Sequence, residues 1–335
     1  MLRGAFIGFG NVAAHGHVPG WRTRNDAAIV AACDATESRR QAFLEAFPQG
    51  RWYGTADELL AGETLDFVDI CTPPGSHAAL ILRALGAGLD VLCEKPLVTR
   101  FEDAIALVSA RAGHVIHCVH NWLEAPICRS ITALIAEGAV GRVRSVRWQT
   151  LRTKPAVAVA TDGAENWRVN PAAAGGGILF DHGWHALYCV NRWIGGAPRS
   201  ITASLQTRRF HEWPLEDTAT LDLEFDGATS HIFLTWAADE RANRIELEGE
   251  KGHIRVDGSG IVVEGPSGTR TLSYAQSLTD GSHHPDWFAG VAKDFCAAVA
   301  GRTAGNLNDA VLCARLLDLA KKSSASGSGR MVLGG

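Results

Sequence analysis

Short apolar runs alternate with longer amphipathic stretches along the first 120 residues. Each run is four to six residues long, apolar on both faces and bounded by turn residues, which is typical of buried strands: Ala5–Gly8, Ala28–Cys33, Asp66–Cys71, Asp90–Cys93 and His114–Val119. Stretches with helical periodicity lie between these runs: Thr36–Phe47, Ser76–Ala87 and Thr99–Ala112. This alternation predicts an α/β domain with a parallel, doubly wound sheet and helices on both faces.

The pattern changes after Asn121 to short strand-like segments joined by hairpin turns. A helix is expected from Pro126 to Glu137, because Pro favours a first helical position and Gly138 ends the helix. The strand-like segments that follow are Val143–Leu151, Ile201–Arg208, Thr218–Phe225, Ser230–Trp236, Arg244–Glu248, His253–Val256, Ile261–Glu264 and Thr269–Tyr274. Turn pairs such as Asp226–Gly227 join several of them, so we expect an α+β domain with a large, open, mostly antiparallel sheet.

Two helical stretches, Asp286–Ala300 and Asn308–Lys322, follow the last strand, and a Ser/Gly-rich tail at 323–329 is expected to be loosely held. The length of 335 residues fits two domains of roughly 150 residues each. We place a first domain at 1–120 and a second at 121–335, whose C-terminal helices are free to pack back on the first domain.

Charge and cysteine content narrow the class of protein. The net charge of −4 provides no basic surface for nucleic acid or for an anionic membrane. The sequence shows no apolar stretch of about 20 residues and no signal-peptide pattern. Its eight cysteines form no CxxC pair, so buried reduced thiols are expected rather than disulfides. We therefore expect a cytoplasmic protein with neither nucleic acid nor membrane as a partner.

A glycine-rich turn directly follows the first expected strand. The segment Gly8-Phe9-Gly10-Asn11-Val12-Ala13 fits the GxGxxA pattern, in which Gly8 permits a tight turn and Gly10 lets the backbone approach a pyrophosphate. The helix that it opens directs N–H groups at the phosphates. The second expected strand ends at Asp34, where a carboxylate can accept hydrogen bonds from the adenine ribose. These features predict a dinucleotide site.

Asp34 also bears on which dinucleotide binds. Its carboxylate would repel a 2′-phosphate, which favours NAD over NADP. Arg39 and Arg40 follow it closely and leave NADP open, since an Arg can pair with that phosphate. We expect NAD as the cofactor.

Glu94-Lys95-Pro96 follows the fifth expected strand. Lys95 is therefore expected at the carboxyl edge of the sheet, where open α/β sheets bind their ligands. Its ammonium group can hydrogen-bond a carbonyl or hydroxyl oxygen of a substrate. A solvated lysine at a strand end is the other interpretation.

A second candidate segment runs from Gly175-Gly176-Gly177 to His185. The glycines allow the backbone to bend close to a ligand before a helix starts. In a helix, Asp181 and His185 are four residues apart and share a face, so the carboxylate can orient the imidazole as a general base. Asp181, His182 and His185 also offer one carboxylate and two imidazoles to a metal ion, and a helix cap beside a core histidine is a third interpretation. No further ligand stands out, and we expect no metal.

Together these motifs resemble one family. The GxGxxA turn, Asp34, Glu94-Lys95-Pro96 and the GGGxxxDxxxH pattern, with Cys71-Thr72-Pro73-Pro74 and His77 in between, are similar to the glucose–fructose oxidoreductase / inositol dehydrogenase / rhizopine-catabolism (Gfo/Idh/MocA) family. The resemblance implies an N-terminal Rossmann domain and a C-terminal domain with an open sheet. It also implies NAD(P)-dependent interconversion of a secondary alcohol and a ketone on a sugar or cyclitol.

The resemblance assigns roles to individual residues. Lys95, Asp181 and His185 match catalytic positions: His185 would take the hydroxyl proton, Lys95 would hold the substrate oxygen and Asp181 would position the pair. The residues expected to bind the cofactor are Gly8, Gly10, Asn11, Val12, Asp34, Arg39, Thr72, Pro73, His77, Glu94, Lys95 and Asn121. One departure is Leu123, where members of the family often carry Arg in an Asn-x-Arg-x-x-Pro motif.

The substrate side is expected to combine aromatic and polar side chains, which suit the C–H and hydroxyl surfaces of a sugar. The candidates are Trp122, Trp167, Arg168 and His182, with core packing as the other explanation for most tryptophans. The alternating strands at Thr218–Trp236 suggest a homo-oligomer, a dimer or tetramer, built through the C-terminal sheet. Two other functions stay open: a non-redox glycoside-cleaving enzyme that holds NAD, and a cofactor-binding sensor without turnover.

Overall fold

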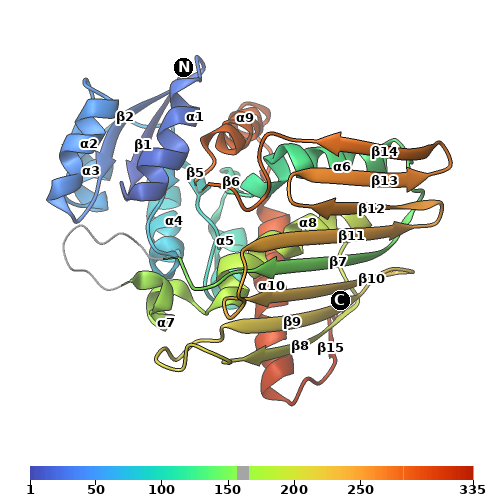
Figure 1. Cartoon of the computed structure of the whole chain (residues 1–335). Coiled ribbons are helices and arrows are strands. Elements are labelled where there is room, and N and C mark those ends of the chain that lie inside the picture. The colour runs from blue at the N-terminus through green and yellow to red at the C-terminus, as the bar shows by residue number, and fades with distance from the viewer. Residues whose placement is uncertain (157–165, 282, 335) are drawn as a thin grey trace. The chain divides into compact units, whose positions relative to one another are not determined.

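The computed structural model describes residues 1–156, 166–281 and 283–334 and divides the chain into two compact units (Figure 1). Unit 1 contains Met1–Glu124 and Gly281–Val311, and unit 2 contains Ala125–Asp280 and Leu312–Gly335.

Unit 1 is built on a six-stranded sheet in which every strand pairs in parallel, in the order β3-β2-β1-β4-β5-β6. The strands are β1 (Leu2–Ile7), β2 (Ala27–Cys33), β3 (Arg51–Tyr53), β4 (Phe67–Ile70), β5 (Asp90–Cys93) and β6 (Ile116–Cys118). This order confirms the expected doubly wound parallel sheet, whose strand order reverses between β1 and β4. The edge strand β3 was not predicted, because its three residues contain no apolar run.

The helices of unit 1 connect these strands. They are α1 (Val18–Arg22), α2 (Arg40–Ala46), α3 (Ala56–Gly62), α4 (His77–Gly86), α5 (Phe101–Ala110) and α9 (Pro285–Gly301), with 3-10 turns at Glu37–Arg39, Pro74–Ser76 and Asn121–Glu124. A π-helix at Val12–His17 stands where the sequence predicted the first turns of a regular helix. Such wide turns occur mostly as short insertions and often at functional sites.

The core of unit 1 joins distant parts of the sequence through aromatic rings. Phe295 of α9 meets the rings of Trp21 and Phe67 with centroids 6.3 and 5.2 Å away, both edge to face. Such pairs add about 0.5–1.5 kcal/mol each beyond the area that they bury. These aromatic contacts pack α9, which lies near the end of the chain, against the first 124 residues.

Unit 2 is built on a nine-stranded sheet in the order β14-β13-β12-β11-β7-β10-β9-β8-β15. The strands are β7 (Val143–Leu151), β8 (Ser200–Gln206), β9 (Thr218–Glu224), β10 (Thr229–Thr235), β11 (Ala242–Gly249), β12 (Gly252–Asp257), β13 (Gly260–Gly265), β14 (Gly268–Ser273) and β15 (Met331–Val332). Only β7 and β10 pair in parallel among these described strands. The sheet is therefore the large, mostly antiparallel one that the sequence predicted.

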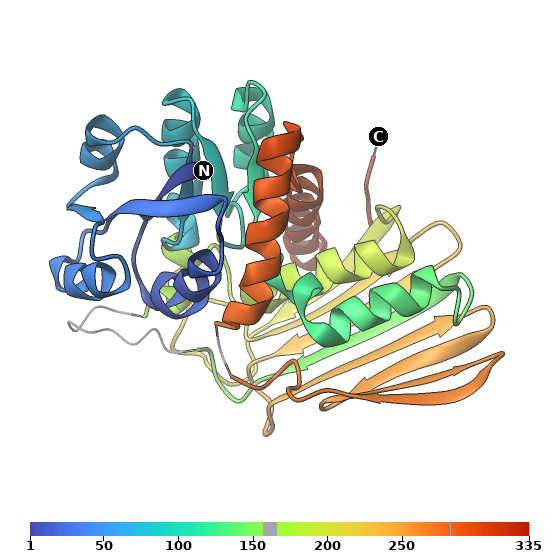
Figure 2. The same ribbon diagram turned by 90° about the horizontal axis from the view of Figure 1, so that it is seen from above.

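One face of this sheet packs on helices. The helices and turns of unit 2 are α6 (Pro126–Ala136), α7 (Pro171–Ala174), α8 (Trp184–Ile194), most of α10 (Leu307–Ala325), a 3-10 turn at Trp167–Val169 and a π-helix at Leu179–Gly183. Figure 2 shows α6 and α8 side by side on one face. The pattern of β7 agrees, since Val146 and Trp148 are buried whereas Arg147 between them is exposed.

The Ser/Gly-rich tail is ordered, so the expectation of a loosely held segment is wrong. Helix α10 continues to Ala325, and the hydroxyl oxygens of Ser323 and Ser324 accept hydrogen bonds from the backbone N–H groups of Ala203 and Leu205 at 2.8 and 2.9 Å. These serines satisfy the N–H groups of β8 beyond its short pairing with β15. Composition alone does not show this, because the partners lie about 120 residues away.

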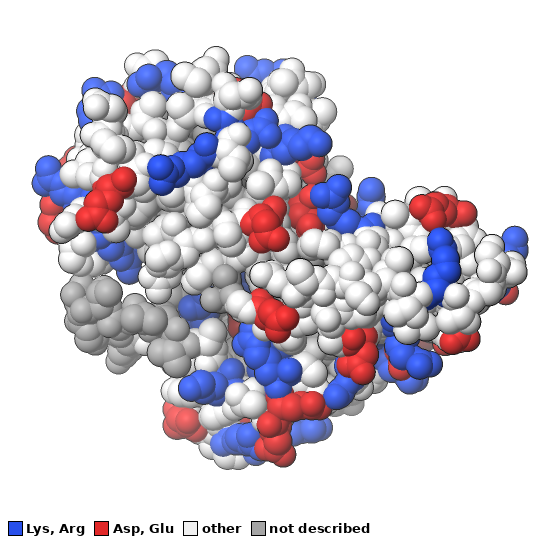
Figure 3. Space-filling view, turned by 45° about the horizontal axis from the view of Figure 1, so that its top comes forward, with Lys and Arg blue, Asp and Glu red and all other residues white. Residues whose placement is uncertain are grey.

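Three further observations concern the protein's surroundings. All eight cysteines are free thiols, as predicted, and seven of them are buried. Among the described residues, no helix combines the length and apolar character needed to cross a membrane. On the face drawn in Figure 3, basic and acidic side chains are interspersed.

Candidate active site

The glycine-rich turn of unit 1 has a backbone that only glycine adopts readily. Gly8 has φ +88°, and a Cβ atom there would lie 2.7 Å from the methyl carbon of Thr72. Gly10 is more open, with the Arg39 guanidinium 3.6 Å from the position that a Cβ would take. The turn is thus held close to the end of β4, and its backbone at Gly10 carries no side chain that would block a ligand.

Asp34 lies directly after β2 and fixes the turn. Its carboxylate accepts hydrogen bonds from the backbone N–H groups of Phe9 and Thr36, both at 2.8 Å. It also pairs with Nη1 of Arg39 at 2.7 Å. Asp34 favours NAD and Arg39 leaves NADP open, and in the structure these two side chains form an ion pair next to the turn.

The loops after β4 and β5 are tied together by His77. Its Nε2 lies 2.8 Å from the carbonyl oxygen of Thr72, and its Nδ1 lies 2.9 Å from that of Pro96. The ring is fully buried, and burial lowers the pKa of His77. Any effect of His77 on a ligand therefore acts through the two loops. The carbonyl oxygen of Pro73 accepts a hydrogen bond from the backbone N–H of Ser76 at 3.1 Å, which closes the turn after β4.

Lys95 stands at the carboxyl edge of the parallel sheet. It follows β5 after Glu94, and its backbone N–H donates to Oε2 of Glu94 at 2.9 Å. The side chain is half-buried, whereas the following Leu97 and Val98 are fully buried and anchor the segment. The sequence predicted this placement from strand order alone.

The segment after β6 carries Asn121 and Trp122. Oδ1 of Asn121 is enclosed and has no hydrogen-bond partner among the described residues. An orphaned amide oxygen of this kind fits a site whose ligand supplies a donor. Trp122 is buried, with its ring edge to face with Trp287 at 6.4 Å, so within unit 1 it is a packing residue.

In unit 2, two of the three glycines before Asp181 are explained by the local packing and backbone. Gly175 ends α7 with φ +84°, and a Cβ on Gly177 would lie 1.9 Å from the carbonyl oxygen of Glu216. The Glu216 carboxylate accepts hydrogen bonds from the backbone N–H groups of Gly177 and Leu179 at 2.8 and 3.2 Å. Burial raises the pKa of Glu216, although these N–H groups favour its charged form. The sequence predicted that the glycines let the backbone approach a ligand. In the structure, Gly177 instead lets the backbone lie close to Glu216.

Asp181 and His182 lie in the π-helix, and His185 lies in the first turn of α8. Nε2 of His182 is 3.5 Å from Oδ2 of Asp181, and Nδ1 of His185 is 2.7 Å from Oη of Tyr188. Tyr188 is not among the residues predicted from the sequence. Its i+3 spacing from His185 on a helix was the available signal.

Two arginines of unit 2 lie beside predicted site residues. Arg168 places its guanidinium 4.5 Å from the ring centroid of Trp167, and both residues are half-buried. Arg152 follows β7 and is 3% exposed. Burial lowers its pKa to about 10, with the nearby Arg241 acting in the same direction and Asp181 opposing it. Arg152 thus adds positive charge to the surroundings of Asp181.

The predicted site residues therefore divide between the two units. Unit 1 carries the turn, Asp34, Lys95 and Asn121, and unit 2 carries Asp181, His182, His185 and the Trp167–Arg168 pair. The first set contains a glycine-rich turn and an acidic residue of the kind that dinucleotide sites use, together with an ammonium group, and the second contains an imidazole and a carboxylate, which are groups able to transfer protons.

Comparison with known families matches both units. Residues 2–119 match the oxidoreductase family with an NAD-binding Rossmann fold, and residues 128–255 match the GFO/IDH/MocA C-terminal domain. The NAD-binding domain confirms the cofactor predicted from the turn and Asp34.

Individual relatives agree with this. D-apiose dehydrogenase of Paraburkholderia graminis is 30% identical over 286 residues, which cover 82% of this chain and 72% of the relative. D-glucoside 3-dehydrogenase of Escherichia coli is 30% identical over 67% of this chain and 64% of the relative.

Solved structures share the whole fold. An oxidoreductase from Agrobacterium radiobacter in complex with NAD+, L-tartaric acid and magnesium has a TM-score of 0.85 at 25% identity, over 99% of this chain and 98% of the other. GenD2 from gentamicin A biosynthesis, in complex with NAD, has a TM-score of 0.84 at 26% identity, over 100% and 97%.

Proposed function

This chain belongs to the Gfo/Idh/MocA family of NAD-binding oxidoreductases, and we propose that it interconverts a secondary alcohol and a ketone on a sugar or cyclitol. The observation that carries the proposal is the position of Lys95, directly after β5 at the carboxyl edge of an NAD-binding Rossmann sheet. The sugar class is supported by the relatives, which are named for apiose and glucosides.

We propose that unit 1 holds the cofactor through the residues predicted from the sequence. Gly8, Gly10, Asn11 and Val12 would face the pyrophosphate, and Asp34, with Arg39 beside it, would face the adenine ribose. Thr72, Pro73, Glu94 and Asn121 would line the rest of the site, with His77 holding two of its loops. The open backbone at Gly10 and the orphaned oxygen of Asn121 fit this group. When bound, NAD accepts the hydride from the substrate carbon.

Residues of this chain would bind the substrate hydroxyl group and remove its proton. The Lys95 ammonium would donate a hydrogen bond to the substrate oxygen and stabilise negative charge on it as the proton leaves. His185, oriented by Tyr188, would take that proton, and Asp181 would stabilise the resulting imidazolium. In the direction of reduction, the same groups would return the proton to the oxygen.

Unit 2 would bind the sugar. Trp167 with Arg168 stacked on it offers an aromatic face beside polar N–H groups, and His182 lies next to Asp181. A sugar presents C–H groups to such a face and hydroxyl groups to such donors. Trp122 is a weaker candidate, because its ring is buried in unit 1.

We further propose a cytoplasmic homo-oligomer built through the sheet face opposite α6 and α8. The free thiols favour a reducing compartment. The sheet face carries paired polar groups, such as Arg147 with Glu246 at 3.6 Å, and a cavity of about 420 Å³ lined in part by Leu151, Arg208 and Phe233. Sedimentation of the purified protein tests this point, and a monomer at micromolar concentration would contradict it.

A screen at 340 nm tests the proposed activity. D-Apiose, methyl D-glucosides and inositols are supplied with NAD+ or NADP+, and 1,5-anhydro-D-fructose is supplied with NADH. Turnover with at least one member supports a dehydrogenase. Glycoside cleavage without net change in absorbance would indicate the non-redox enzyme, and NAD binding without turnover would indicate a sensor.

A further inference from the structure

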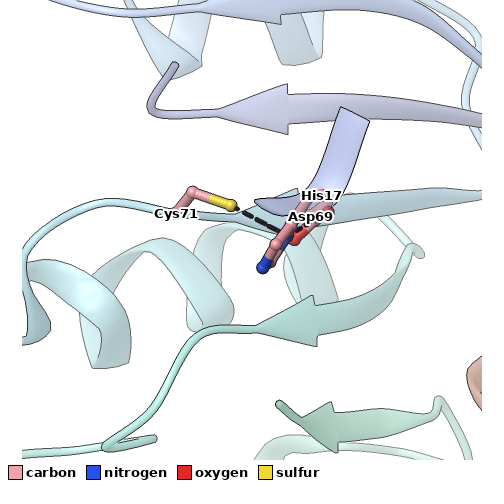
Figure 4. Close-up of side chains that lie close together, drawn as sticks. All are labelled: His17, Asp69 and Cys71. Carbon is pink, nitrogen blue, oxygen red and sulfur yellow. Dashed lines mark hydrogen bonds and ion pairs between the residues drawn. The ribbon is translucent and has the colours of Figure 1, made fainter. Parts of the chain in front are cut away.

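A buried histidine in unit 1 lies between two carboxylates and has no part in the function described so far. His17 is 2% exposed and is the last residue of the π-helix. Its Nδ1 lies 2.8 Å from Oδ2 of Asp69 on β4, and its Nε2 lies 3.0 Å from Oε1 of Glu94 after β5. Figure 4 shows the ring of His17 and the side chain of Cys71 converging on Asp69.

Both contacts are hydrogen bonds to charged carboxylates when each ring nitrogen carries a proton. A neutral imidazole donates from one nitrogen only, and the lone pair on the other would then face a carboxylate oxygen. Burial works against the charged form of His17, but the attraction of Asp69 and the hydrogen bonds to Asp69 and Glu94 outweigh it and raise the pKa of His17 to about 9. His17 is therefore an imidazolium at neutral pH.

A metal ion is the competing interpretation of the same cluster. The ligand atoms of His17, Asp69 and Cys71 lie within 4.8 Å of one another. However, Nδ1 of His17 is only 2.8 Å from the Asp69 oxygen, whereas two ligands of one tetrahedral zinc ion are about 3.3 Å apart. Burial also raises the pKa of the Cys71 thiol well above its ordinary value, which disfavours a thiolate. The distance between Nδ1 of His17 and Oδ2 of Asp69 is that of a hydrogen bond.

The surroundings hold the His17 ring in one orientation. The ring of Phe288 stacks on it at 3.7 Å and 15°. The indole N–H of Trp21 donates to the same Asp69 oxygen at 2.7 Å, and the Cys71 thiol donates to the other oxygen at 3.4 Å. Neither the ring nor its Asp69 partner is free to turn away from Glu94.

Glu94 connects this cluster to Lys95. One of its oxygens accepts from His17, and the other accepts the backbone N–H of Lys95 at 2.9 Å. The hydrogen bond from His17, together with the charges of His17 and Lys95, lowers the pKa of Glu94 although burial opposes this. The carboxylate is thus charged, and both of its oxygens are engaged.

We propose that protonated His17 is a positioning residue that orients Lys95 by holding the Glu94 carboxylate on the Lys95 backbone. The inference rests on the proposed role of Lys95. It predicts that loss of the His17 proton releases Glu94 and lowers turnover, while NAD binding persists. Among the described residues, the groups that face the His17 ring are Asp69, Glu94, the Cys71 thiol, Phe6 and Phe288, and of these only the two carboxylates carry a charge.

Histidine NMR tests the proton directly. Protein labelled at the ¹³Cε1 position of histidine is titrated from pH 6 to 10 with saturating NAD+, and His17→Gln identifies the resonance. We expect that resonance to titrate near pH 9, and about one unit lower in Glu94→Gln, which lacks one carboxylate. The exposed His15, in the same π-helix, is the control, and His15→Asn should leave the His17 resonance unchanged. A His17 resonance that titrates below pH 7 would overturn the proposal, and the Glu94→Gln measurement stands even if His17→Gln does not fold.

Kinetics test the link to Lys95, with the sugar that the screen shows to turn over fastest. His17→Gln should lower kcat about 10- to 100-fold and leave Kd for NAD+ within twofold. The alkaline decline of kcat near pH 9 should move to lower pH in Glu94→Gln and vanish in His17→Gln. If Lys95→Met is inactive but His17→Gln keeps the kcat and pH profile of the wild type, only this inference fails. If Lys95→Met stays active, the proposed function fails first.

Discussion

The phenolic oxygen of Tyr188 lies 2.7 Å from Nδ1 of His185, one turn apart on α8. Both side chains are buried, so the hydrogen bond fixes the orientation of the imidazole ring. The phenol donates to Nδ1 or accepts from it, according to the tautomer of the ring.

Replacing Tyr188 by Phe removes that hydrogen bond while keeping the ring. Because a neutral hydrogen bond is worth about 1 kcal/mol, kcat should fall about 5- to 10-fold with little change in KM for the cofactor. Steady-state kinetics measure this, and Tyr274→Phe, at the end of β14, serves as the matched control. Equal kcat values for Tyr188→Phe and the wild type would remove Tyr188 from the site.

Asp34 and Arg39 should set the choice between NAD and NADP. In Asp34→Ser, the repulsion of a 2′-phosphate disappears and Arg39 loses the ion pair that occupies it. The ratio of kcat/KM for NADP+ to that for NAD+ should then rise about tenfold or more. The exposed Arg40, which pairs with Glu37 instead, is the control, and Arg40→Ala should leave the ratio unchanged. A ratio that does not rise in Asp34→Ser would show that these residues do not face the ribose.

Gly177 should tolerate no side chain. Its Cβ would lie 1.9 Å from the Glu216 carbonyl oxygen, so Gly177→Ala should destabilise the protein by about 1–3 kcal/mol. Gly86, at the end of α4, has nothing within 4 Å of its Cβ position. Gly86→Ala should therefore be neutral or stabilise by up to about 1 kcal/mol. Urea unfolding followed by circular dichroism compares the two variants, and equal midpoints would contradict the packing described here.

Stability should depend on pH in both directions through buried histidines of unit 1. The pKa of His17 is raised to about 9, so its contribution is complete below pH 6.5 and is lost as pH rises toward 9. Burial lowers the pKa of His117 to about 4 and, together with His117, that of His120 to about 3. Their contribution is complete above pH 6.5 and is lost as pH falls toward those values.

Thermal unfolding from pH 4 to 9.5 measures the loss of stability at acid pH and at alkaline pH, which are the acid and alkaline limbs of a plot of Tm against pH. The Tm should peak near pH 6.5, and His17→Gln should flatten the alkaline limb alone. His231 on the sheet of unit 2 is partly exposed, and His231→Gln should change neither limb. A wild-type Tm that stays constant from pH 6.5 to 9 would show that His17 carries no excess proton in the folded state.

Much of the fold follows from local pattern. Every predicted strand is present, because an apolar run such as Asp90–Cys93 has no other way to be buried on both sides. Missed elements such as β3 and α3 are short and half-exposed, so their sequence carries little periodicity. The ordered tail depends on Ser323 reaching a strand that is distant in sequence, which no local pattern contains.

The site was predictable where a residue follows a strand. Asp34 and Lys95 were placed correctly because chain order fixes which residues reach the carboxyl edge of a parallel sheet. The partners of those residues were not predictable. His17, which contacts Glu94, is the last residue of a π-helix that the sequence pattern does not predict, and Glu216 reaches Gly177 from another part of unit 2.

The main expectation is that Lys95 acts on the substrate oxygen during hydride transfer and contributes little to the affinity for NAD. It is tested by measuring, on the same preparation, kcat at 340 nm and calorimetric Kd for NAD+ in the wild type and in Lys95→Met. The account predicts that kcat falls about 100- to 10,000-fold while Kd stays within threefold. A Lys95→Met enzyme with a kcat within threefold of the wild type would contradict it.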